Sequence, residues 1–113
     1  MRIYISGPIT GIEPFIAYRW FLNAEWKIQK LGHIAVNPLK IGYFLPEDFR
    51  HQDFMDVDMA ILKKMDAIVL LDGWESSKGC TQEFAYACRN DMKVFYDIDD
   101  IPDAIDEEGI NKL

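Results

Sequence analysis

The feature that most constrains this chain is the apolar run Ala-Ile-Val-Leu-Leu at residues 67–71, which ends directly at Asp72. A short, continuous apolar run bounded by turn residues is typical of a strand buried within a sheet. The loop after Asp72 is rich in small and polar residues, and Gly79 then opens a helix whose early turns contain Glu83. This order of strand, loop and helix indicates an α/β fold, in which ligands bind beyond the C-terminal ends of the strands.

Strands and helices alternate along the whole chain. We expect strands at 2–6, 33–36, 66–72 and 92–97, and helices at 14–31, 52–65 and 79–90. Pro14 starts the first helix and Gly32 stops it, whereas the stretch from Asn37 to about residue 50 is read as irregular. The alternation predicts a three-layer α/β sandwich with a mainly parallel sheet of four or five strands, flavodoxin-like or Rossmann-like.

Length and charge limit the organisation and the partners of the protein. The 113 residues fit a single domain, 1–113, with an acidic tail from about residue 98. Hydrophobic residues make up 50% of the chain, which is enough for a packed core. The net charge of −7 argues against nucleic-acid polymers and against an anionic membrane surface. A small anionic ligand remains compatible, because backbone N–H groups can bind it locally.

Cysteine use and hydropathy predict a cytoplasmic protein. Cys80 and Cys88 lie on one expected helix about 12 Å apart, too far for a disulfide. We see no signal peptide and no membrane-spanning run. His33 and His51 lack a second ligand at metal-binding spacing, and the acidic run from Asp97 to Glu108 lacks the register of a calcium loop. We therefore expect no metal and no cofactor.

Three carboxylates are candidates for chemistry. Asp58 falls in the middle of the apolar face of the 52–65 helix, where a carboxylate is costly unless it is paired. It either caps a neighbouring loop or points at a ligand. Glu83 is either a surface residue that complements the helix dipole or a nucleophile, and Asp72 either caps the turn with Gly73 or faces a ligand. A pair such as Asp72 and Glu83 suggests chemistry at a C–O or C–N bond of a sugar.

Two loops and one strand supply the remaining site candidates. Tyr4 alternates with Ile3 and Ile5, so it faces the same side as Ser6 and is either core filler or a site residue. The glycine-containing loop after the first strand lacks the lysine of a Walker loop and the G-x-G-x-x-G pattern, so its phosphate signal is weak. The expected substrate-binding residues are Ser6, Gly7, Pro8, Ile9, Thr10, Gly11, Asn37, Gly73, Trp74, Ser76, Ser77 and Gly79.

The helix at 14–31 carries two apolar stripes. One stripe holds Ala17, Trp20, Phe21, Ala24, Ile28 and Leu31, and the other holds Phe15, Tyr18, Leu22 and Trp26. Polar residues separate the stripes, with Glu25 and Gln29 on one side. One stripe packs on the sheet, and the second needs another partner in so small a domain. We expect a homo-oligomer, a dimer or larger, formed through this helix.

Taken together, these residues resemble the nucleoside 2-deoxyribosyltransferase superfamily, most closely a small branch common in bacteria and their phages. The resemblance spans roughly residues 2–97. It rests on Ile3-Tyr4-Ile5-Ser6-Gly7-Pro8-Ile9-Thr10-Gly11, on Gly32-His33 through Val36-Asn37-Pro38, and on Asp58, Asp66 through Trp74, Ser76, Gly79 and Glu83. Each piece is weak alone, whereas the pieces are specific in this order.

The resemblance implies cleavage or transfer at the N-glycosidic bond of a nucleoside or nucleotide. Glu83 matches the nucleophile that attacks the sugar C1′, and Tyr4 matches a tyrosine that orients it. Asp72 matches an acid that handles the base or a sugar hydroxyl, and Asp58 matches an acid of the nucleotide N-glycosidase members. A covalent glycosyl-enzyme would form and would be resolved by water or by a second base.

Other functions stay open from the sequence. One alternative is a non-catalytic nucleotide binder, including a phage anti-defence protein that sequesters or degrades an ADP-ribose-type signal. Another is a scaffold oligomer with a vestigial pocket. The set of Tyr4, Asp58, Asp72 and Glu83 favours the enzyme over the scaffold. The base, the sugar, the phosphate state and the acceptor stay open.

Overall fold

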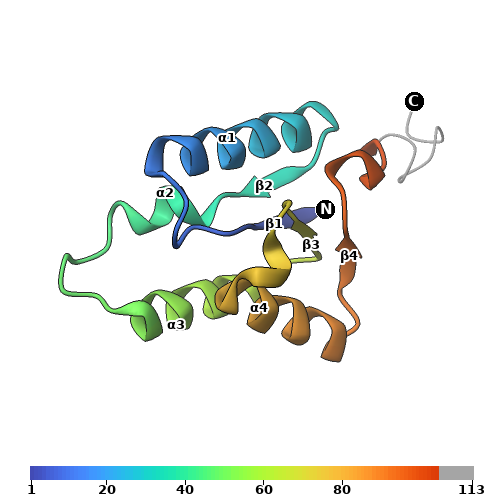
Figure 1. Cartoon of the computed structure of the whole chain (residues 1–113). Coiled ribbons are helices and arrows are strands. Elements are labelled where there is room, and N and C mark those ends of the chain that lie inside the picture. The colour runs from blue at the N-terminus through green and yellow to red at the C-terminus, as the bar shows by residue number, and fades with distance from the viewer. Residues whose placement is uncertain (105–113) are drawn as a thin grey trace.

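The chain folds around one four-stranded sheet in which all paired strands run parallel (Figure 1). The computed structural model describes residues 1–104, so the tail positions Asp106, Glu107 and Glu108 lie outside the described residues. The strands are β1 (Arg2–Ser6), β2 (Ile34–Val36), β3 (Ala67–Leu70) and β4 (Lys93–Phe95). Their order is β2-β1-β3-β4. The predicted α/β fold is confirmed, with four strands in the described part of the chain.

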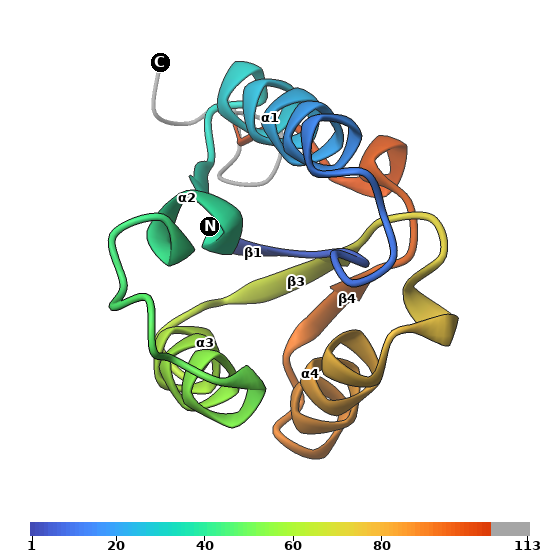
Figure 2. The ribbon, with the colours of Figure 1, turned by 60° about the vertical axis from the view of Figure 1, so that its left-hand side comes forward.

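Helices cover both faces of this sheet (Figure 2). The helices of the described part are α1 (Pro14–Lys30), α2 (Pro38–Gly42), α3 (His51–Leu62) and α4 (Lys78–Arg89). In both views α1 lies on one face, whereas α3 and α4 lie together on the other. This arrangement is the expected three-layer sandwich. In residues 1–104 no helix combines the length and the apolar character needed to cross a bilayer.

The alternation along β1 decides which side chains reach each face. Ile3 and Ile5 are buried in the core beneath α1, where they pack with Phe21. Tyr4 belongs to the second core, on the side of α3 and α4. Ser6 is buried as well. Because residues two apart share a face of a strand, Tyr4 and Ser6 point toward the same helical layer.

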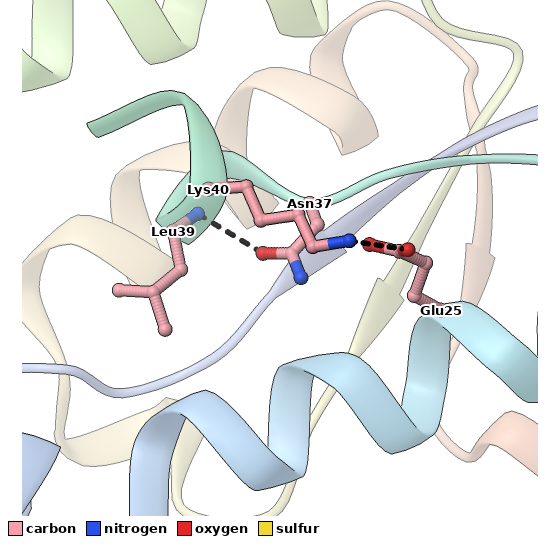
Figure 3. A network of polar contacts seen from close by, with 4 residues as sticks. All are labelled: Glu25, Asn37, Leu39 and Lys40. Carbon is pink, nitrogen blue, oxygen red and sulfur yellow. Dashed lines mark hydrogen bonds and ion pairs between the residues drawn. The ribbon is translucent and has the colours of Figure 1, made fainter. Parts of the chain in front are cut away.

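Residues 38–42, which the sequence analysis assigned to an irregular stretch, form helix α2. The side-chain oxygen of Asn37 accepts a hydrogen bond from the backbone N–H of Leu39 at 3.1 Å (Figure 3). Pro38 then occupies the first turn, where its missing N–H costs nothing. Asn37 is thus an N-cap, and its Nδ2 is buried without a hydrogen-bond partner in the described structure.

Helix α2 also explains the burial of Glu25 on α1. Nζ of Lys40 on α2 lies 2.8 Å from Oε2 of Glu25 on α1, and the Glu25 side chain is buried (Figure 3). The sequence pattern placed Glu25 among the polar residues that separate the two stripes, and it did not indicate that α2 would cover this side of α1. The hydrogen bond to Glu25 raises the pKa of the Lys40 ammonium group.

The second stripe of α1 is only partly covered within residues 1–104. Phe15 is 64% exposed and Trp26 is 56% exposed, whereas Tyr18 and Leu22 between them are half-buried. Trp20 of the other stripe is also 45% exposed, so that stripe is not wholly packed on the sheet. The outer face of α1 is therefore an unusually apolar surface for a domain of this size.

The beginning of the acidic segment joins the folded core. Ile101 is buried beneath α1 with Ile28 and Ile3. The carbonyl oxygen of Pro102 lies 2.6 Å from Nε2 of His33, which is buried and has a structural role. Acidic side chains of this segment, such as Asp99, point to solvent, as expected for a solvated face. The packed domain thus continues beyond residue 98.

Candidate functional site

A cavity opens at the C-terminal ends of β1 and β3. The chain leaves β1 for β2 on one side and returns to β3 on the other, so these two ends form the switch point of the sheet. The cavity has a volume of about 930 Å³ and is lined by Gly7 and Pro8 after β1 and by Asp72 and Gly73 after β3. Ligand pockets commonly measure about 300–1,000 Å³, and they occur preferentially at such switch points.

Glu83 on α4 is the most buried charged group in this cavity, with only 5% of its surface exposed. Its Oε2 accepts a hydrogen bond from the Tyr4 hydroxyl at 2.5 Å. Its Oε1 accepts a hydrogen bond from the Ser6 hydroxyl at 2.8 Å. Both donors come from the same face of β1. Strand β1 therefore holds both oxygens of the carboxylate that helix α4 carries.

The local sequence of α4 explains why Glu83 faces the cavity. The Ser77 hydroxyl caps the helix by accepting from the backbone N–H of Cys80 at 3.3 Å. Cys80, Glu83 and Ala87 are buried, and their spacing of three and four residues defines one face of the helix. Glu83 lies on that face and not on the solvent side. The reading of Glu83 as a dipole-complementing surface residue is wrong.

Asp58 on α3 is the second carboxylate of the site. It lines the same cavity, and burial together with the negative charge of Glu83 raises its pKa to about 7. A carboxyl group with this pKa is largely protonated at slightly acidic pH and can give up its proton near neutrality. The electrostatically coupled pair is therefore Asp58 and Glu83.

The hydrogen bonds and the burial of Glu83 act in opposite directions. Burial raises the pKa of Glu83 because the charged form loses water. The bonds from Tyr4 and Ser6 lower it, because they stabilise the carboxylate. Burial, and then the charge of Glu83, raise the pKa of Tyr4 well above its ordinary value, so that Tyr4 keeps its proton and remains a donor.

Asp72 is the third carboxylate that lines the cavity. It lines the rim of the cavity and is exposed, and within residues 1–104 it makes no hydrogen bond or ion pair. Gly73 follows with a φ of +86°, the left-handed conformation that a turn after Asp72 requires. Asp72 and Glu83 thus line one cavity, and Asp58 is the carboxyl group whose pKa the charge of Glu83 raises.

The loop after β1 contributes part of the cavity wall. Gly7, Pro8, Ile9 and Thr10 line it, whereas Gly11 does not. A Cβ atom on Gly7 would lie 2.9 Å from Cδ1 of Leu71, so this glycine allows close packing of β1 against the end of β3. Its small size therefore serves the core as well as the cavity.

The loop and helix start after β3 form a polar wall. Ser76, Ser77, Lys78 and Gly79 line the cavity. Trp74 does not, because its ring packs on Phe84 with 4.8 Å between ring centroids. Asn37 and Ser6 are also absent from the wall, since Asn37 caps α2 and Ser6 lies behind Glu83.

An apolar and aromatic wall faces this polar one, and the sequence analysis did not identify it as part of the site. It is built from α1, α2, α3 and the loops beside them. His51 at the start of α3 and Cys80 on α4 also line the cavity, and neither had been assigned to a site. The apolar members of the wall are Ile12, Trp20, Phe21, Pro38, Leu39, Tyr43, Phe54 and Met55. Asn37 and Pro38 could have indicated that a helix begins here and brings Leu39 and Tyr43 to the site.

Metal ligation is the remaining property of the site. In residues 1–104, no three His, Cys, Asp or Glu side chains come together in a way that could hold a metal ion. The two thiols of this stretch are free, as the sequence predicted. Burial raises the pKa of the Cys80 thiol, against the effect of hydrogen bonds from Ser6 and Ser77. Cys80 is therefore a poor thiolate nucleophile.

Fold and cavity together define a small α/β protein with a coupled carboxylate pair at the switch point of a parallel sheet. The chain belongs to the family described as a domain of unknown function (DUF4406), whose model matches residues 1–96. No curated protein matches this chain. The family match includes every element that builds the cavity.

Proposed function

We propose that this protein cleaves or transfers the N-glycosidic bond of a nucleoside or nucleotide, with Glu83 as the nucleophile. The observation that carries the proposal is the environment of Glu83. It is a buried carboxylate at a ligand-sized cavity, held at both oxygens by Tyr4 and Ser6 and coupled to Asp58. A glutamate that only complements the helix dipole at the surface would not need burial, two hydrogen-bond donors or a second carboxyl group beside it. The resemblance of the motifs to the nucleoside 2-deoxyribosyltransferases agrees with this role.

In the proposed reaction an oxygen of ionised Glu83 attacks the sugar C1′. The bond between C1′ and the base nitrogen breaks, and its electron pair leaves with the base. Asp58, which is protonated below a pH of about 7, gives its proton to the departing base. Water or a second base then attacks C1′ of the glycosyl-enzyme and releases Glu83. Asp58 takes up the proton of that incoming group.

The two walls of the cavity suit the two parts of a nucleoside. The aromatic and aliphatic residues, Trp20, Tyr43 and Phe54 among them, offer surfaces for a planar base. The polar wall at Ser76–Lys78 offers donors for sugar hydroxyls or a 5′-phosphate. Asp72 at the rim is placed to accept a hydrogen bond from the base or from a sugar hydroxyl.

We further propose a homo-oligomer formed through the outer face of α1, in the cytoplasm. Phe15 and Trp26 leave an apolar surface that a second copy of the chain would cover. Trp20, which is partly exposed, also lines the cavity, so assembly at this helix would lie close to the substrate. Free thiols suit a reducing compartment.

The experiment that tests the activity is product analysis by liquid chromatography and mass spectrometry. Wild type and Glu83→Ala are incubated with a panel of ribo- and deoxyribonucleosides, their 5′-monophosphates and ADP-ribose-derived nucleotides. The proposal predicts that wild type alone releases a free base, or exchanges it when a second base is added. Base release at equal rates by both proteins would remove Glu83 from the mechanism.

The size of the cavity favours one second candidate, a non-catalytic nucleotide binder. A volume of about 930 Å³ is near the upper limit for ligand pockets and leaves room for more than a nucleoside. Such a protein would deplete one free nucleotide and return it unchanged on denaturation. Glu83→Gln would then reduce binding only slightly. The same incubations distinguish the two functions.

A further inference from the structure

We propose that Ser6 is a positioning residue, which orients Glu83 and never touches the substrate. This inference rests on the proposed function and deepens it. Ser6 is only 1% exposed, and it does not line the cavity that Glu83 lines. Its hydroxyl donates to Oε1 of Glu83 at 2.8 Å and also lies near the thiol of Cys80. Ser6 was expected to bind substrate, and the geometry instead places it behind the nucleophile.

The backbone of Ser6 is fixed against β3, so its hydroxyl is a rigid anchor. Ser6 is the last residue of β1 and pairs with Leu70 of β3. Its carbonyl oxygen accepts a hydrogen bond from the N–H of Leu71 at 2.8 Å. The next residue, Gly7, packs against the Leu71 side chain. A hydroxyl held in this way can define the position of an oxygen atom on a neighbouring helix.

Two donors are needed because one does not fix a carboxylate. The terminal torsion of a glutamate side chain is broad, so the plane of the group can rotate about its last bond. Tyr4 holds Oε2 and Ser6 holds Oε1, which removes this freedom. Each carboxylate oxygen offers about two lone-pair sites, so a lone pair stays available to attack C1′. A fixed attack direction contributes directly to rate.

The hydroxyl proton of Ser6 can serve only one acceptor at a time, and the geometry gives it to Glu83. That bond stabilises the ionised form and opposes the effect of burial on the pKa of Glu83. Loss of the hydroxyl therefore has two consequences: a looser carboxylate and a carboxylate that ionises at higher pH. A residue that contacts substrate would produce neither.

The test compares Ser6→Ala with a control that removes a hydroxyl from α4, the helix that carries Glu83. Thr81→Ala is that control, because the Thr81 hydroxyl bonds the carbonyl of Lys78 and does not line the cavity. The carboxyl resonance of Glu83, assigned by its absence in Glu83→Gln, is titrated by ¹³C NMR in each protein. The pH dependence of kcat and of KM is measured in parallel on the substrate found by product analysis.

For Ser6→Ala we expect a higher pKa of Glu83, an acidic limb of the kcat profile displaced to higher pH, and a fall in kcat on the order of 10- to 100-fold with KM within about twofold. Thr81→Ala should match wild type in all three. The S–H group of Ser6→Cys is a weaker donor than a hydroxyl, so this variant should give values between those of wild type and Ser6→Ala. It replaces Ser6→Ala in the test if the alanine variant does not fold.

Two results would overturn the inference. One is a rise in KM with an unchanged pKa of Glu83, which would make Ser6 a substrate contact. The other is an unchanged titration of Glu83 in both Ser6 variants. Failure of the proposed function has a different signature, since wild type would then release no base from any compound. The NMR titration needs no substrate and still decides whether Ser6 holds Glu83.

Discussion

The Tyr4 hydroxyl on β1 lies 2.5 Å from Oε2 of Glu83 on α4, although the two residues are 79 positions apart in the chain. Burial keeps Tyr4 protonated, so it acts as a donor to the carboxylate at every physiological pH. Tyr4 is also part of the core beneath α4, where it packs with Ile68 and Ala87. The same side chain therefore contributes to folding and orients the candidate nucleophile.

Replacement of Tyr4 by phenylalanine removes the donor and preserves the ring. We expect Tyr4→Phe to lower the free energy of unfolding by about 1.5–3 kcal/mol near neutral pH, because a buried carboxylate loses a hydrogen bond. The pKa of Glu83 rises further in this variant, so the loss shrinks as pH falls and Glu83 becomes protonated. Chemical denaturation at several pH values measures this dependence.

The matched control for this experiment is Tyr86→Phe on α4. Tyr86 packs against the same core, and its hydroxyl has no hydrogen-bond partner within residues 1–104. Tyr86→Phe should change stability by only a few tenths of a kcal/mol, on the order typical of substitutions away from special features. Equal effects of the two variants would show that the bond from Tyr4 to Glu83 contributes nothing.

Asp58→Asn should change the pH dependence of the reaction. In the proposed reaction Asp58 donates a proton in the first step, so activity should decline as pH rises through about 7, where Asp58 ionises. Asn cannot donate the proton, and kcat should fall on the order of 10²–10⁴-fold and lose that alkaline limb. Because Asp58 and Glu83 are coupled, the apparent pKa values of the acidic and alkaline limbs of the pH profile belong to the pair and not to either residue alone. An alkaline limb retained in Asp58→Asn would assign it to another group.

The same substitution tests the stability linkage with a definite sign. The folded-state pKa of Asp58 is raised from 3.8 to about 7, so wild type loses stability as pH rises through this window. Asp58→Asn avoids that loss and should gain about 1–2 kcal/mol over wild type between pH 4 and pH 8, after allowance for screening of the partly exposed carboxyl group. A difference independent of pH would refute the raised pKa.

Glu83→Gln separates binding from chemistry. The glutamine side chain preserves the volume, and its carbonyl oxygen still accepts one of the two hydroxyl bonds. We expect turnover to fall by a factor on the order of 10³ or more, whereas substrate affinity, measured by calorimetry, changes by less than about tenfold. Loss of both together would indicate that Glu83 is required for substrate binding.

The outer face of α1 gives a prediction about assembly. Trp26→Glu places a charge on the exposed stripe and should reduce the mass of the oligomer measured by light scattering. Ile34→Glu is the control, because Ile34 is similarly exposed, at 62%, but lies on the edge strand β2. Trp26→Glu with an unchanged mass, or a monomeric wild type, would remove α1 as the interface.

Much of the fold was readable in the sequence because it depends on local patterns. The apolar run of β3, the alternation along β1, and the proline and glycine that bound α1 each have a short-range cause. Helix α2 was also signalled, by Asn37 and Pro38, but five residues carry too little periodicity to be recognised as a helix. The burial of Glu25 then followed from α2, which no pattern within α1 encodes.

The site was less predictable because it depends on distances between elements. Glu83, Tyr4 and Asp58 were singled out by position or resemblance, and all three line one cavity. The partnership of Asp58 with Glu83 follows from the packing of α3 against α4, which no spacing in the chain specifies. For the same reason Ser6 could be placed on the correct face of β1 but not behind the nucleophile.

The central claim is that Glu83 forms a bond to the sugar, and trapping that bond tests it most directly. A nucleoside carrying fluorine at the 2′ position slows both steps by destabilising positive charge at C1′, so the glycosyl-enzyme should accumulate when the base is a good leaving group. Peptide mapping by mass spectrometry should then locate one added sugar on Glu83 in wild type and none in Glu83→Gln. Base release from the matching natural nucleoside, with a sugar adduct on another residue or with full activity in Glu83→Gln, would contradict the account.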